Sequence, residues 1–181
     1  MRGYITFYDS PMGCITLASD GKSITGLWFE GQKYYGNGLS KECLKEELPV
    51  FLEAKRWLTR YFRGEDPGEI PPVRAKGTSF QETVWKLLKK IPYGKTITYG
   101  ELAKQLAHLR GLDHMSAQAV GQAVGHNPIG ILVPCHRVVG AKGKLTGYAG
   151  GIEKKERLLI IEGFCVEDGQ IKYRPVCGKG I

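Results

Sequence analysis

A segment rich in proline and glycine divides the chain and limits what it can fold into. Residues 65–77 contain Pro67, Pro71 and Pro72 together with two glycines, a composition that neither a helix interior nor a central strand tolerates. Such a segment is typical of a linker that runs extended over the surface. With 181 residues the chain can hold one or two domains of ordinary size, and this segment predicts two.

The balance of charge changes at the same place. Residues 1–75 contain 10 Lys or Arg and 10 Asp or Glu, whereas residues 76–181 contain 16 and 8, so the whole net charge of +8 lies in the second part. This bias favours a polyanionic partner, because contacts to phosphates release counterions from nucleic acid. A basic surface without any partner is the alternative, and charge alone does not decide between them.

Other features of composition exclude several classes of protein. No apolar run approaches the ~18 residues of a membrane span, and residues 1–10 lack the apolar stretch of a signal peptide. We therefore expect a cytoplasmic protein, with nuclear access in a eukaryote, and no membrane partner. The five cysteines are widely spaced, with no CxxC pair and no matching histidines, so we expect neither a disulfide framework nor a metal site.

The first part has the pattern of a small sheet followed by a helix. Three strand-like stretches, separated by turn sequences, cover residues 4–8, 14–18 and 24–29. A helix is predicted from Pro49, with an apolar stripe on one face and a stop at Gly64.

The second part has the pattern of successive short helices. Ser79 is followed by Glu82 in the spacing of a capping box, which marks the start of a helix, and Thr98 and Glu101 repeat this pattern. A third helix, residues 117–125, is rich in alanine and glycine and could lie close to another surface. In a basic region this order favours a helix-turn-helix that meets DNA, with an ordinary helix pair in a core as the alternative.

The most unusual stretch is an apolar run, residues 129–133, that leads into Pro-Cys-His-Arg. A thiol must be ionised to attack carbon, and a cationic neighbourhood lowers its pKa. His136 and Arg137 supply such a neighbourhood for Cys135 in sequence. Adjacent residues of an extended chain point to opposite sides, so a bridging water is one way for His136 to reach the thiol. The alternative is a cysteine that has no special role.

A glycine-rich loop, residues 146–151, and a helix follow this stretch. The helix is predicted over residues 152–161 and ends beside Glu162. An acidic side chain at a helix C-terminus opposes the helix dipole, so Glu162 indicates a compensating cationic partner, unless it is simply a solvated charge.

Together these motifs resemble the O6-alkylguanine-DNA alkyltransferases. The strongest match is Ile-Leu-Val-Pro-Cys-His-Arg-Val-Val at residues 131–139, which is similar to the active-site signature of that family. Further matches occur in family order across residues 79–163, at residues 92–96, 98–103, 119–121, 127–128, 147–151 and 158–163. The first third is similar in layout.

The resemblance implies a fold of the α/β (α+β) class in two domains. Residues 1–75 would form a ribonuclease-H-like domain, with the linker at 65–77, and residues 78–166 a winged-helix domain that binds DNA and carries the alkyltransferase site. Residues 167–181 would be a tail.

The resemblance also implies a chemistry. Cys135 would accept the alkyl group of O6-alkylguanine in double-stranded DNA, with O4-alkylthymine as a second candidate lesion. His136 would activate the thiol through a water, Glu162 would orient the imidazole, and Tyr99 would donate to guanine N3 as the base leaves. The base must be everted to reach the thiol. Transfer would be irreversible and stoichiometric, in a monomer without a cofactor.

The third helix would enter the minor groove, where Ala119 and Gly121 permit close approach. Gln118 stands where the family commonly has an arginine that enters the base stack in place of the everted nucleotide. Asn127 would brace the helix against the active site. The backbone of Val138 would accept from the guanine amine, and Tyr148 and Ala149 would cover the pocket. Arg137 is also expected among the residues that bind substrate or DNA.

Three other functions are compatible with parts of this pattern. A non-enzymatic relative could bind alkylated bases and recruit repair factors, but such proteins lack the acceptor cysteine. A helix-turn-helix regulator could use Cys135 as an alkylation sensor. A Cys–His hydrolase would turn over on an ester or amide, although neighbouring positions make a direct Cys–His dyad awkward.

Overall fold

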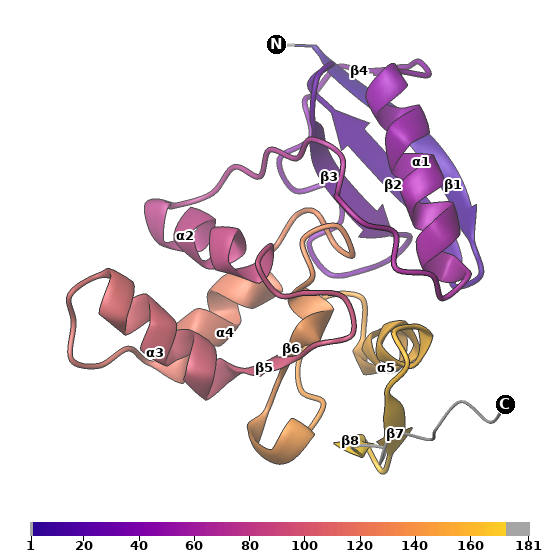
Figure 1. Ribbon diagram of the computed structural model, residues 1–181. Coiled ribbons are helices and arrows are strands. Elements are labelled where there is room, and N and C mark those ends of the chain that lie inside the picture. The colour runs from indigo at the N-terminus through magenta and orange to yellow at the C-terminus, as the bar shows by residue number, and fades with distance from the viewer. Residues whose placement is uncertain (1, 173–181) are drawn as a thin grey trace, which may run out of the picture.

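The computed structural model describes residues 2–172 of the chain. Its helices and strands form two parts joined by the proline-rich segment 65–77 (Figure 1). The first part comprises β1 (Gly3–Ser10), β2 (Gly13–Ser19), β3 (Ile24–Phe29), β4 (Cys43–Lys45) and α1 (Pro49–Phe62). The second comprises α2 (Ser79–Leu88), β5 (Ile97–Thr98), α3 (Tyr99–Leu109), α4 (Ala117–Gly125), the short 3₁₀ helices η1 (Cys135–Arg137) and η2 (Ala141–Gly143), β6 (Val138–Val139), α5 (Ile152–Ile161), β7 (Cys165–Glu167) and β8 (Gln170–Lys172).

The sheet of the first part has the strand order β3-β2-β1-β4. β1, β2 and β3 form the antiparallel meander predicted from the sequence, whereas β4 pairs with β1 in parallel and was not predicted. β4 has only three residues and no buried side chain, so it carries no alternation that a sequence pattern could detect. The sheet therefore gains an edge strand that only tertiary pairing defines.

Helix α1 lies across one face of this sheet, as Figure 1 shows. It begins at Pro49, where a proline costs no hydrogen bond, and the chain leaves it through Gly64 at a φ of 74°, a conformation that glycine adopts readily. Both predicted ends are confirmed. The buried stripe of α1 consists of Val50, Phe51, Ala54, Trp57, Leu58 and Tyr61.

The proline-rich segment contains no helix or named strand, and it is fastened to the first part. The amide of Ile24 donates to the Pro72 carbonyl at 2.8 Å, and the amide of Arg74 donates to the Ile24 carbonyl at 2.8 Å. One cluster of buried hydrophobic side chains also continues from the sheet and α1 into α2, α3 and α4. The two parts therefore share one hydrophobic core.

The start of α2 differs by one residue from the predicted capping box. Thr78, not Ser79, is the N-cap: its hydroxyl accepts from the amide of Gln81 at 3.2 Å, and the Gln81 side chain accepts from the Thr78 amide at 2.9 Å. Ser79 is the first helical residue. The sequence offers two overlapping boxes, and only the extended backbone at Thr78 selects between them.

The other helices of the second part begin as predicted. Thr98 and Glu101 form the capping box of α3, and the Ser116 hydroxyl caps α4. α4 packs against both α2 and α3, and the Trp85 indole donates to the Ala123 carbonyl at 2.8 Å. β5 pairs in parallel with β6, immediately after the Cys-His-Arg turn. The mixed α/β fold class, with a sheet part and a helical part, is confirmed.

Within the described residues the chain ends in a hairpin, which turns between Glu167 and Gln170 at the start of the predicted tail. β7 and β8 are antiparallel, and Ile171 is buried with Val139, Leu145 and Leu159. The remainder of the predicted tail, residues 173–181, lies outside the described residues.

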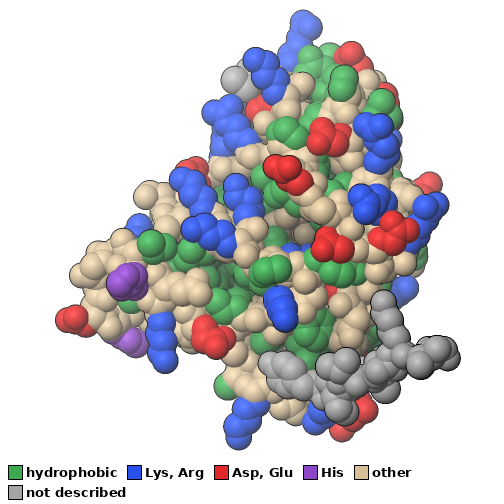
Figure 2. Space-filling model, in the orientation of Figure 1, with side chains coloured by type: hydrophobic (Ala, Val, Ile, Leu, Met, Phe, Trp, Pro, Cys, Tyr) green, Lys and Arg blue, Asp and Glu red, His purple; other side chains and the backbone are tan. Residues whose placement is uncertain are grey.

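Basic side chains are spread over both parts of the face seen in Figure 2, with acidic side chains among them. On this face the excess positive charge is not gathered into one patch. Within residues 2–172, no helix has both the length and the apolar character needed to cross a bilayer.

Candidate active site

The thiol of Cys135 lies at the start of η1, after Pro134 and the run 129–133, which is buried except at Gly130. Ile131 in this run has a φ of 64°, which is rare for a β-branched residue, so the chain turns sharply before the thiol. The side chain of Cys135 is 7% exposed. The expectation of an extended chain at Cys135 and His136 is wrong, because these residues form a 3₁₀ turn in which strand alternation does not apply.

Asn127 holds this turn against the end of α4. Its side-chain amide donates to the Val133 carbonyl at 2.7 Å, and its side-chain oxygen accepts from the Ile129 amide at 3.0 Å. Asn127 is buried and also forms a hydrogen bond with the Cys135 thiol that lowers the thiol pKa. One side chain thus connects the helix, the apolar run and the sulfur.

His136 and Glu162 form a buried pair. Nε2 of His136 lies 2.6 Å from Oε1 of Glu162, and neither side chain is exposed. Burial lowers the pKa of His136 below its ordinary value, and this outweighs the opposite effect of Glu162. The imidazole is therefore neutral near pH 7, with its hydrogen on Nε2 facing the carboxylate. Nδ1 is then the basic nitrogen, and it is buried without a hydrogen-bond partner among the described residues.

Arg137, which the resemblance places among the residues that bind substrate or DNA, completes the environment of Glu162. Nε of Arg137 lies 2.9 Å from Oε2 and 3.1 Å from Oε1 of Glu162, and Nη1 donates to the Ile91 carbonyl at 2.7 Å. Arg137 is buried. Burial alone would raise the pKa of Glu162, but hydrogen bonds and charge from His136 and Arg137 lower it to about 2. Glu162 is therefore ionised and has the cationic partner that its position predicted.

The cationic neighbourhood expected for the thiol also needs correction. Burial raises the pKa of Cys135 above its ordinary value, with Asn127 and the charge of Lys155 acting in the opposite direction. The charge of Arg137 is compensated by Glu162. Near pH 7 the free protein therefore holds a neutral thiol beside a neutral imidazole, and the thiol proton must be removed during the reaction.

Lys155 is a functional candidate that the sequence analysis missed. It is fully buried, and its ammonium donates to the carbonyls of Val138 at 2.5 Å, Thr146 at 2.9 Å and Gly147 at 3.3 Å. Burial lowers the pKa of Lys155 to about 8, although the negative charge of an ionised Cys135 acts to raise it. A signal existed, because Lys155 precedes the buried Leu158 by three residues and so lies on the inner face of α5.

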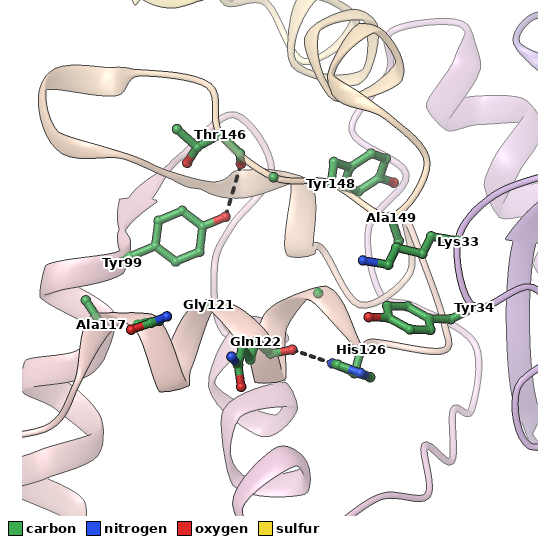
Figure 3. A pocket seen from close by; sticks show the side chains of 13 residues that line it. Lys33, Tyr34, Tyr99, Ala117, Gly121, Gln122, His126, Thr146, Tyr148 and Ala149 are labelled. Carbon is green, nitrogen blue, oxygen red and sulfur yellow. Dashed lines mark hydrogen bonds between the residues drawn. The ribbon is translucent and has the colours of Figure 1, made fainter.

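A cavity of about 690 Å³ opens beside this site. As Figure 3 shows, it lies between α4, the glycine-rich loop 146–149 and a segment of the first part that contains Lys33 and Tyr34. Tyr99 lines it and donates to the Thr146 carbonyl at 3.2 Å. Burial raises the pKa of Tyr99, so its hydroxyl stays protonated. The charge of Cys135 also raises the pKa of Tyr99 and of Tyr148, another lining residue, although Cys135 itself does not line the cavity.

Two family models match the chain. The ribonuclease-like domain of 6-O-methylguanine DNA methyltransferase matches residues 4–69, and the DNA-binding domain of the same protein matches residues 79–164. The chain belongs to the 6-O-methylguanine DNA methyltransferase family.

Relatives within this methyltransferase family cover nearly the whole chain. The methylated-DNA–protein-cysteine methyltransferase of Haemophilus influenzae is 44% identical and covers 88% of this chain and 86% of its own. The methylated-DNA–protein-cysteine methyltransferase of Methanosarcina acetivorans is also 44% identical, over 90% of this chain and 99% of its own. The crystal structure of Mycobacterium tuberculosis OGT in complex with DNA is 43% identical, with a TM-score of 0.76, and covers 88% of this chain and 92% of that one.

The structure brings most of the residues predicted from the resemblance to this methyltransferase family around one place. Cys135, His136, Asn127 and Glu162 lie together in the buried network described above. The cavity is lined by Tyr99, Gln118, Gly121, Tyr148 and Ala149. Val138 is buried beside Lys155, and Ala119 lies on α4 but does not line the cavity. Among residues 2–172, no three His, Cys, Asp or Glu side chains gather as metal ligands would.

Proposed function

We propose that the protein repairs DNA by moving the alkyl group of O6-alkylguanine onto its own Cys135, once per molecule. The observation that carries this proposal is a buried thiol, followed in sequence by a neutral imidazole whose Nε2 is held by Glu162 and whose Nδ1 has no hydrogen-bond partner within residues 2–172. All of the proposed site residues come from one chain, so we propose that the protein acts as a monomer on double-stranded DNA.

The transfer is a displacement at the alkyl carbon. Nδ1 of His136 takes the thiol proton through a bridging water, and the sulfur of Cys135 forms a bond to the alkyl carbon. The bond between that carbon and guanine O6 breaks, and its electron pair stays on the base. Guanine is a poor leaving group unless its developing charge is neutralised, so Tyr99 donates its hydroxyl proton at N3. Glu162 stabilises the resulting imidazolium.

The target base has to leave the duplex to reach the cavity, because the thiol is buried. Gln118 is exposed on α4 at the cavity, where it can occupy the vacated space in the base stack. The small side chains of Ala119 and Gly121 permit close approach to the minor groove. The Val138 carbonyl already accepts from Lys155, and its second lone pair can accept from the guanine amine.

The product is a thioether, which no side chain of the site can cleave. Duplex DNA with a labelled methyl group on O6 of guanine should therefore lose label to protein at a ratio near one to one, with no further turnover. A Cys135→Ser variant should bind the duplex and take no label. If label stays on the DNA although wild-type protein binds it tightly, the protein is a lesion-binding factor rather than a transferase.

A further inference from the structure

The first part of the chain supplies one rim of the cavity. Lys33 and Tyr34, from the turn after β3, line it opposite the end of α4, where His126 lies. The rings of Tyr34 and His126 stack at 4.4 Å with an angle of 26°, and the Lys33 ammonium lies 5.1 Å from the centre of the Tyr34 ring. Figure 3 shows the Lys33 ammonium and the Tyr34 hydroxyl directed to the same side, toward the cavity.

This rim is held in place from three directions. The amide of Lys33 donates to the carbonyl of Ala149 in the glycine-rich loop at 3.1 Å. The His126 ring is fixed by a contact of 2.7 Å between Nδ1 and the Gln122 carbonyl. Because a carbonyl can only accept, this nitrogen carries the hydrogen. Tyr34 has a φ of 62°, which turns its ring onto His126. The arrangement therefore exists before any ligand arrives.

The exposed groups of the rim are donors. Lys33 is exposed and takes part in none of the ion pairs within residues 2–172, and Tyr34 is 39% exposed. An ammonium and a hydroxyl that point the same way fit the oxygens of a phosphate, which only accept. A nucleotide that enters the cavity must bring its own phosphates to the cavity edge, because they remain attached to the sugar.

We propose that Lys33 and Tyr34, supported by His126, bind the phosphate backbone of the DNA strand whose base enters the cavity. The first part of the chain thus takes part in DNA binding, together with α4. This inference rests on the proposed function, because it takes an everted nucleotide as the occupant.

The test is the salt dependence of DNA binding. One lost phosphate contact reduces the slope of log K against log salt concentration by about 0.9, which corresponds to about eightfold weaker binding at 0.1 M salt and little change near 1 M. Binding of a duplex with O6-methylguanine is measured in a Cys135→Ser background, which blocks transfer. We expect Lys33→Ala to show this change in slope.

Lys45→Ala is the matched control, because Lys45 also lies over an aromatic ring, that of Phe7, but on the sheet away from the cavity. It should keep the parent slope. An unchanged slope for Lys33→Ala, or an equal change for Lys45→Ala, would overturn the inference. If the parent protein transfers no methyl group at all, the proposed function fails, while the binding slopes still decide the role of Lys33.

Discussion

The hydroxyl of Tyr61 in α1 donates a hydrogen bond of 2.9 Å to Oε1 of Glu162, the same oxygen that lies 2.6 Å from Nε2 of His136. Burial and the charge of Glu162 hold the pKa of Tyr61 well above its ordinary value, so the hydroxyl remains a donor. The ring of Tyr61 also stacks on Trp57 at 5.4 Å, which fixes it to the core of the first part. The sheet part of the chain thereby helps to hold the carboxylate that orients the active-site histidine.

Tyr61→Phe should therefore weaken both the fold and the reaction. The ring packing is kept, while a buried oxygen of Glu162 loses one donor, so we expect a loss of about 1–2 kcal/mol in the free energy of unfolding. If about 1 kcal/mol of this is also lost in the transition state, alkyl transfer slows about fivefold. Tyr8→Phe removes a partly buried hydroxyl of the same part, far from Glu162 in the chain, and should leave the transfer rate unchanged. Equal rates for wild type and Tyr61→Phe would contradict this role.

The rate of transfer should depend on pH through His136. Only the neutral imidazole can take the thiol proton, and burial puts the pKa of His136 below its ordinary value of 6.5. The rate should thus be level near pH 7 and fall only when the pH drops through this lowered pKa. The rate of His136→Ala should not show this fall at low pH. It should increase only as Cys135 ionises, at a pKa above the ordinary 9.0. A wild-type rate that already falls between pH 8 and 7 would argue against His136 as the base.

Acid should destabilise the protein through Glu162. Its pKa is about 2 in the folded state against an ordinary 4.5, so its contribution is present above pH 4.5 and is lost as the pH falls toward 2. The difference corresponds to about 3 kcal/mol. Chemical denaturation at pH 5 and pH 3 should show a steeper loss for wild type than for Glu162→Gln. If wild type and Glu162→Gln lose the same free energy of unfolding between pH 5 and pH 3, the ionised form of Glu162 does not stabilise the fold.

Removal of the buried ammonium of Lys155 should be costly. Lys155→Met removes a donor from three carbonyls, of which only that of Thr146 keeps another, the Tyr99 hydroxyl, and we expect a loss of about 3 kcal/mol or more in the free energy of unfolding. The pKa of Cys135 should rise further, because the charge of Lys155 lowers it. Both can be followed by denaturation and by thiol alkylation as a function of pH. Lys154→Met changes the neighbouring, less buried lysine of α5 and should have little effect on either measurement.

The parts of the site that sequence could predict are those with local signals. The unusual apolar run before Cys-His-Arg singled out Cys135, and the unfavourable position of Glu162 at a helix end predicted a partner. The partners themselves follow from long-range packing: Arg137 lies 25 residues from Glu162 in sequence, and Tyr61 lies 101 residues away. No periodicity connects residues at such separations.

Other features of the structure could not be predicted, because the local sequence pattern is compatible with two different structures. Lys155 lies in a run of charged residues that is typical of a solvated helix face, and only its spacing from Leu158 indicates the buried side. The overlapping boxes at Thr78 and Ser79 differ by a single residue. Tyr34 was not singled out, because its place at the cavity depends on how the first part packs against α4.

In the proposed reaction the sulfur of Cys135 receives the alkyl group and keeps it. Mass spectrometry of peptides from protein that has been incubated with O6-methylguanine duplex measures this directly. We expect one added methyl group on the peptide that contains Cys135, and no change on peptides that contain any of the other four cysteines, Cys14, Cys43, Cys165 and Cys177. Repaired DNA together with an unmodified Cys135 peptide, or a methyl group on another cysteine, would contradict it.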